Sequence, residues 1–97
     1  MIIDFYDKGT EDVYNGVNSR QARETLPVKL RRIALRRFYF LENAVNLKDL
    51  RMPSGNHLEV LRGDRRGQHS IRINDRYRIC FLWSEKGPKR VEIVDYH

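Results

Sequence analysis

The chain has 97 residues, 40% hydrophobic and 33% charged, which is enough for one domain spanning residues 1–97 with its own core. This composition excludes a disordered segment, and no apolar run approaches the ~20 residues of a membrane-spanning helix. The net charge is +6, and the only cysteine, Cys80, excludes an intrachain disulfide framework and a cysteine-based zinc site. Residues 1–4 lack the basic start and long apolar region of a secretory signal, so we expect a cytoplasmic protein.

The first half of the chain predicts one short strand and two helices. Residues 2–5 are rich in branched and aromatic side chains and predict the strand. Residues 10–14 predict a short helix that ends at Asn15-Gly16, because glycine readily adopts the left-handed conformation that closes many helices. The clearest helix runs over residues 27–44, since proline suits a first helical turn.

The helix over residues 27–44 carries an apolar stripe. At 100° per residue the stripe consists of Leu26, Leu30, Ile33, Ala34, Phe38, Leu41 and Val45. We expect this stripe to pack on a sheet. Arg37 projects near its middle, so this side chain is expected to extend to solvent, pair with an acid or mark a functional edge.

The second half of the chain predicts strands. Residues 52–56 combine proline, serine, glycine and asparagine and predict a loop, beyond which the hydrophobic period becomes two. Strands are predicted at residues 58–61, 70–73, 77–84 and 91–96. Helices followed by strands with short turns predict an α+β domain, with N-terminal helices on one face of an antiparallel meander. Cys80 falls inside the third strand, where we expect it to be packed rather than reactive.

Arginine is concentrated in the predicted sheet. Fourteen of the nineteen basic residues are arginine, and seven of these lie within residues 51–78. The predicted order leaves the second face of the sheet without a helix to cover it. This face and its turns would carry Arg62, Arg65, Arg66, Arg72, Arg76 and Arg78. Because a guanidinium binds phosphate through two hydrogen bonds, the sequence predicts a nucleic-acid partner rather than a merely solvated basic surface.

Residues for metal or nucleotide-triphosphate chemistry are poorly placed, whereas the last three residues can handle protons. His57, His69 and His97 are widely separated, and there is no paired-histidine zinc motif or phosphate-binding glycine loop. RNA supplies its own nucleophile, the 2′-hydroxyl, so cleavage needs only a base, an acid and cations. Asp95, Tyr96 and His97 could fill these roles without a metal, or they could be the frayed end of a strand.

Three motifs carry a family resemblance. They are the turn at residues 61–67 (L-R-G-D-R-R-G), the strand at residues 77–81 (Y-R-I-C-F) and the terminal D-Y-H at residues 95–97. Together they resemble the HigB family of bacterial toxins, within the wider RelE/ParE superfamily. The match is closest over residues 50–97, and the loop at residues 53–56 resembles the GraT-type branch.

This resemblance implies a RelE-like microbial ribonuclease fold and a specific activity. Members are toxins of type II toxin–antitoxin systems that enter the ribosomal A site and cut the mRNA there without a metal. A HigA-type antitoxin, a helix-turn-helix protein that also represses the operon, neutralises them. Carried over by position, the family's site residues fall on Arg62, Arg65, Arg78, Asp95, Tyr96 and His97.

One position departs from the family pattern. Many members have a site histidine where this chain has Glu59, two residues after His57. Either Glu59 handles the proton in place of that histidine, or the His57 side chain reaches the site, or the remaining site residues suffice for cleavage. We expect slower cleavage than in members with the histidine, because a carboxylate repels RNA. The alternatives are a ParE-like poison of DNA gyrase, a non-catalytic RNA-binding protein and a decayed toxin that only binds its antitoxin.

Overall fold

The computed structural model describes residues 1–96 as an α+β fold. Its helices are α1 (Lys8–Asn15), α2 (Arg20–Thr25) and α3 (Arg31–Asn43). Four short 3₁₀ helices are η1 (Val28–Leu30), η2 (Leu47–Arg51), η3 (Ser54–Asn56) and η4 (Gly63–Arg65). The strands are β1 (Glu59–Val60), β2 (His69–Arg72), β3 (Tyr77–Ser84) and β4 (Gly87–Asp95).

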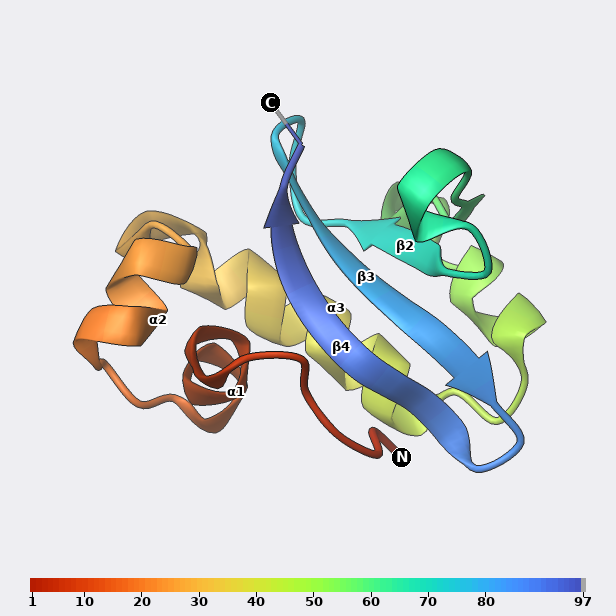
Figure 1. The fold of residues 1–97 in the computed structure, drawn as a ribbon, viewed down its shortest axis with the longest axis horizontal. Coiled ribbons are helices and arrows are strands. Elements are labelled where there is room, and N and C mark those ends of the chain that lie inside the picture. Colours follow the sequence, from red (N-terminus) through yellow and green to blue (C-terminus); the bar gives the residue numbers. More distant parts are fainter. Residues whose placement is uncertain (97) are drawn as a thin grey trace.

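The strands form one antiparallel sheet in the order β1-β2-β3-β4, which confirms the predicted meander (Figure 1). The sequence predicts a strand at residues 2–5, but these residues do not form a full strand. They run extended beside β4 and form a single parallel bridge, between Phe5 and Val91. The backbone N–H groups of Ile3 and Tyr6 donate to Pro88 and Val91 along this edge. The first residues therefore cover the β4 edge, while β1 forms the other edge.

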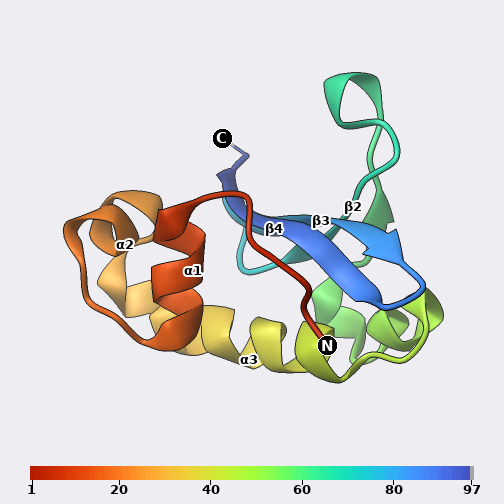
Figure 2. The same cartoon turned by 60° about the horizontal axis from the view of Figure 1, so that its bottom comes forward.

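The core lies between α3 and one face of the sheet (Figure 2). Strand alternation directs Ile71, Ile79 and Ile93 toward the helices, and all three are buried. Phe38 of α3 is buried against them, and the rings of Phe5 and Tyr14 meet it nearly edge-on. Helices on one face of an antiparallel sheet were predicted and are confirmed.

The first helix was predicted well, whereas α2 was missed. The Asp7 side chain caps α1 by accepting a hydrogen bond from the Thr10 N–H, and Gly16 closes the helix in the left-handed conformation at φ 74°. A hydroxyl cap at Ser19 starts α2, and Ala22 is its only buried residue. Such a short helix has too little apolar periodicity to be recognised in the sequence.

The predicted helix over residues 27–44 begins later and exposes part of its stripe. Pro27 is extended, the next turn is the 3₁₀ helix η1, and the α-helix starts only at Arg31. Ile33 is 40% exposed and Val45 is 78% exposed, so neither belongs to the core. The tighter winding of the 3₁₀ helix η1 changes the angle between its residues and those of α3, so the predicted stripe does not stay on one face. Val45 lies beyond the end of α3.

Arg37 connects three parts of the fold, which is none of the three roles predicted for it. Its Nε donates to the carbonyl of Arg72 at 2.8 Å, and a terminal nitrogen donates to Asn56 Oδ1 at 3.1 Å. Burial lowers the pKa of Arg37. Two neutral acceptors thus hold α3 against the end of β2 and η3.

A buried carboxylate in α1 makes stability depend on pH. Asp12 accepts from Lys8 Nζ at 2.7 Å and from the Ser19 hydroxyl at 2.6 Å, and these contacts lower its pKa. The stabilisation is therefore complete above the unfolded value near 4 and is lost as the pH falls further. We expect Asp12→Asn to unfold more easily at pH 7 and to lose less stability between pH 4 and pH 2. Denaturant titrations across this range test it.

The control for Asp12→Asn is Glu11→Gln, which removes one exposed negative charge from the same helix. If both variants follow the same curve of unfolding free energy against pH, the contribution of Asp12 is refuted.

Candidate functional site

The sheet face opposite α3 carries the candidate site. Ser70, Arg78, Cys80 and Glu92 lie on this face, because strand alternation separates them from the core-facing residues. Within residues 1–96 no α-helix covers it, but the loop containing the short 3₁₀ helix η4 stands over it (Figure 2). The open basic face predicted from the sequence is therefore partly enclosed by a loop.

Arg78 is the centre of the site. Its Nε donates to the Ser70 hydroxyl at 2.8 Å, and one NH2 group donates to the carbonyl of His57 at 2.8 Å. The same NH2 group lies 3.0 Å from the Glu59 carboxylate. The side chain is only 12% exposed, so its guanidinium is fixed in orientation. A fixed guanidinium can hold a phosphate without losing much side-chain entropy on binding.

Tyr96 lies over this guanidinium. The Arg78 side chain is 5.9 Å from the centre of the Tyr96 ring, and the Tyr96 N–H donates to the carbonyl of Arg76 at 2.6 Å. Burial raises the pKa of the Tyr96 hydroxyl, so the phenol keeps its proton at neutral pH. Tyr96 can therefore donate a hydrogen bond or a proton next to Arg78.

A second guanidinium borders the site from the loop. Arg65 reaches from η4 to β4, where its NH1 group lies 3.1 Å from Gln68 Oε1 and 3.1 Å from Glu92 Oε1. This contact with Glu92 raises the pKa of Arg65. Cys80 lies buried on the same face, and its burial raises the pKa of its thiol to about 11. The thiol is therefore packed, as predicted, and it keeps its proton at neutral pH.

Arg72, Arg76 and Asp95 are directed to the β2–β3 turn instead. Arg72 forms an ion pair with Asp75, and Arg76 holds both carboxylate oxygens of Asp95 at 2.9 and 2.8 Å. Arg76 lies in the turn before β3 and not within the strand, so its side chain does not join Arg78 on the sheet face. Opposite charges at the turn determine this arrangement.

The remaining predicted residues are only partly placed. Arg62 and Arg66 are exposed on the loop around η4, where they can reach a long anionic ligand. His97 lies outside the described residues. Glu59, the position at which the sequence resemblance leads us to expect a histidine, contacts Arg78 directly, whereas His57 contributes its backbone carbonyl there. The Glu59 carboxylate therefore lies within 3.0 Å of the Arg78 guanidinium.

Ser70 and Glu92 were not among the predicted site residues. Each is an ordinary polar residue on a strand, and its partner lies far along the chain. Ser70 could have been found because it is polar at a position that pairs with the buried Cys80. Glu92 shares the face of Arg78, since Arg78 pairs with Val94, two residues further along β4.

Comparison with known proteins identifies the family of this chain. Residues 3–97 match the sequence profile of a family described as the RelE-like toxin HigB of type II toxin–antitoxin systems. This chain belongs to the HigB family. The Toxin HigB-1 of Vibrio cholerae is 34% identical over 83 residues, which cover 86% of this chain and 84% of that protein. A protein of Haemophilus influenzae is 34% identical over 58 residues, covering 60% of this chain and 57% of its own.

The fold also matches a solved toxin structure. A chain of the YoeB–YefM complex from Staphylococcus aureus superposes with a TM-score of 0.59 at 14% identity, covering 100% of this chain and 98% of its own. At this identity the match supports the RelE-like fold alone. The fold and family expected from the three sequence motifs are confirmed.

Two further properties of this HigB-family chain concern residues 1–96. None of their helices has the length and apolar character needed to cross a bilayer. They also contain no group of three or more His, Cys, Asp or Glu side chains arranged for a metal ion. The metal-free chemistry expected from the sequence stays a prediction.

Proposed function

We propose that this toxin cleaves mRNA on the ribosome. The observation that carries the proposal is the fixed Arg78 guanidinium, which meets a carboxylate from Glu59 and the ring of Tyr96 on an open sheet face. A phosphate bound there would have a base on one side and a proton donor on the other. This is what attack by the 2′-hydroxyl of RNA requires.

The proposed reaction balances without a metal. The 2′-oxygen forms a bond to phosphorus and gives its proton to the Glu59 carboxylate. The bond from phosphorus to the 5′-oxygen breaks, and the leaving oxygen takes a proton from Tyr96 or from His97, the role that the family resemblance implies. Arg78 and Arg65 neutralise the charge that develops on the phosphate oxygens. The products are a 2′,3′-cyclic phosphate and a free 5′-hydroxyl.

The other basic residues would serve binding and position. Arg62 and Arg66 extend from the loop and suit the phosphates of the mRNA or the ribosome. Asp95 and Arg76 hold each other at the end of β4, from which Tyr96 and His97 continue. We also propose a HigA-type helix-turn-helix antitoxin as partner, which the HigB family match supports.

The decisive experiment measures mRNA cleavage on programmed ribosomes with toxin purified free of antitoxin. We expect cleavage by the intact chain and none by a variant lacking Tyr96 and His97. Equal behaviour of the two would refute the catalytic assignment. Inhibition of gyrase supercoiling instead of cleavage would favour the ParE-like alternative, and RNA binding without product would favour the non-catalytic one.

Glu59→Gln tests the proposed base. Glutamine has the same shape and can still accept a hydrogen bond from Arg78, but it cannot take a proton. We expect cleavage on programmed ribosomes to fall about 10²-fold, as for loss of a general base. Glu85→Gln, an exposed carboxylate in the β3–β4 turn, is the matched control and should cleave normally. If Glu59→Gln retains full activity, another group is the base.

A further inference from the structure

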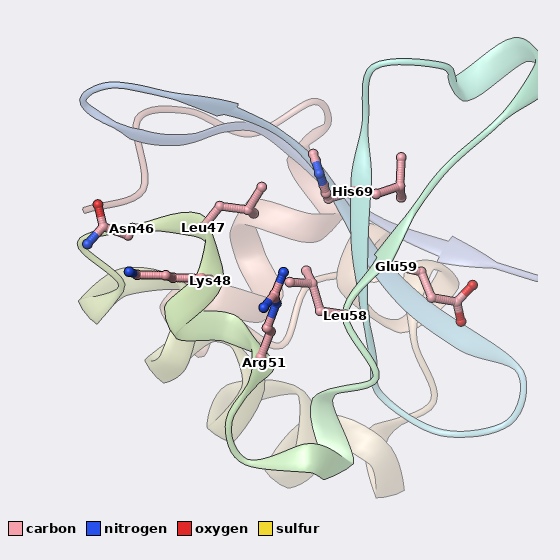
Figure 3. A pocket seen from close by; sticks show the side chains of 8 residues that line it. Asn46, Leu47, Lys48, Arg51, Leu58, Glu59 and His69 are labelled. Atoms are coloured by element: carbon pink, nitrogen blue, oxygen red, sulfur yellow. The ribbon is translucent and has the colours of Figure 1, made fainter.

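A pocket lies on the other side of β1 from Arg78, between η2 and β1. Its volume is about 590 Å³, within the range of small-molecule sites. Eight residues line it: Asn46, Leu47, Lys48, Arg51, Leu58, Glu59, Val60 and His69. Figure 3 shows Arg51 reaching across from η2 while Glu59 points away on the far side of β1.

The floor of this pocket is apolar. Leu47 and Leu58 are half-buried, and Val60 is 68% exposed. The His69 ring stacks on Phe81 with 6.1 Å between ring centres, and its buried Nδ1 has no hydrogen-bond partner within residues 1–96. Exposed apolar side chains beside an aromatic ring suit the face of a planar ligand such as a nucleobase.

The rim of the pocket is cationic. Lys48 and Arg51 are exposed, and neither forms a salt bridge with another residue of the described part of the chain. By contrast, Arg65 and Arg78 each contact a carboxylate. Glu59 is the only acid that lines the pocket, and it is bound to Arg78. Two exposed cations above an apolar floor match a ligand with a planar base and a phosphate.

The pocket and the candidate site are separated by the edge strand β1. Strand β1 has two residues, and alternation sends Glu59 toward Arg78 and Val60 toward the pocket. An RNA strand with one phosphate on Arg78 would need to cross only this edge strand to place a neighbouring nucleotide between Lys48, Arg51 and His69.

We propose that the pocket between η2 and β1 binds one nucleotide of the RNA, adjacent to the phosphate that is cleaved. This inference rests on the proposed function and names a second contact of the same substrate. The base would lie on Leu58, Val60 and His69, and Lys48 and Arg51 would bind its phosphate. Lys48 and Arg51 are then binding residues that determine substrate affinity and do not touch the reacting atoms.

The first test is an NMR titration of the ¹⁵N-labelled protein with adenosine and uridine 5′-monophosphates. We expect the largest shifts at Leu47, Leu58, Val60 and His69. The double variant Lys48→Ala/Arg51→Ala should weaken binding at least about tenfold. The double variant Lys29→Ala/Arg32→Ala removes two exposed charges near the start of α3 and should bind as the unmodified protein does.

The second test uses the same variants in the cleavage assay on programmed ribosomes. At limiting toxin the Lys48→Ala/Arg51→Ala variant should cleave about tenfold more slowly, and saturating toxin should restore the maximal rate. Loss of substrate affinity raises KM and leaves kcat unchanged, whereas a damaged catalytic site lowers kcat.

The outcomes separate this inference from the proposed function. Normal nucleotide binding by the Lys48→Ala/Arg51→Ala variant, or shifts located elsewhere, overturns the pocket even if the mRNA is cleaved. Equal shifts and affinity with inorganic phosphate alone also overturn it, because the base then contributes nothing. Charge-dependent nucleotide shifts at the pocket without any cleavage by the unmodified toxin support the pocket and refute the ribonuclease.

Discussion

Replacing Arg78 by alanine should reduce mRNA cleavage on programmed ribosomes by about 10²- to 10³-fold, the cost of removing one well-oriented donor to a developing charge. The guanidinium is held by Ser70, by the His57 carbonyl and by Glu59, so its position is set before RNA arrives. Its removal takes away the cation and also leaves Glu59 free to repel the phosphate.

Arg78→Lys distinguishes charge from geometry. Lysine keeps the charge but cannot contact Ser70 and His57 with one planar fork, so we expect only partial recovery of cleavage. Arg32→Ala, an exposed arginine of α3, is the control and should cleave normally. Thermal unfolding of each variant separates misfolding from lost chemistry. A folded Arg78→Ala variant with normal cleavage would show that the phosphate binds elsewhere.

Phe38→Ala should produce the largest loss of stability, about 3–5 kcal/mol. The Phe38 ring is 1% exposed, and the rings of Phe5 and Tyr14 meet it with centres 6.4 and 5.4 Å away. Truncation would leave a cavity where α1, α3 and the N-terminal segment converge. Since a domain of this size has only about 5–15 kcal/mol of stability, a large fraction could unfold.

Denaturant unfolding followed by circular dichroism measures the effect of Phe38→Ala. The control is Tyr39→Ala, the next residue of the same helix, which is 65% exposed and should change the free energy of unfolding by less than about 1 kcal/mol. Similar values for the two variants would mean that the ring cluster around Phe38 contributes little.

The strands were predictable where the alternating pattern is long. The third strand was predicted at residues 77–84 and has those bounds, because turn residues flank eight alternating positions. The last strand was predicted at residues 91–96, because Gly87 and Pro88 normally indicate a turn. In the structure it begins at Gly87. Strand β1 has only two residues, and its pairing with β2 depends on the η4 turn more than on its own pattern.

The sequence predicted several of the residues that belong to the candidate site, but not which residues each of them contacts. The arginine cluster and the family motifs identified Arg65, Arg78 and Tyr96, which the fold places around one sheet face. The distribution of charge along the sequence could not show that Arg76 would bind Asp95. These residues are 19 positions apart and meet only because β3 pairs with β4. The pocket of Lys48 and Arg51 depends on how η2 packs beside β1, which no local pattern encodes.

The hydrogen bonds between the first residues and β4 have a consequence for when this toxin becomes active during its own synthesis. Asp4 and Tyr6 pair with Val91, and Tyr96 reaches Arg78 only from the end of β4. A growing polypeptide therefore has neither a closed sheet nor a complete site until residues 88–96 have been translated. If the toxin cleaves mRNA as proposed, a growing chain that has not yet reached residue 96 lacks the contact between Tyr96 and Arg78 on which that cleavage depends.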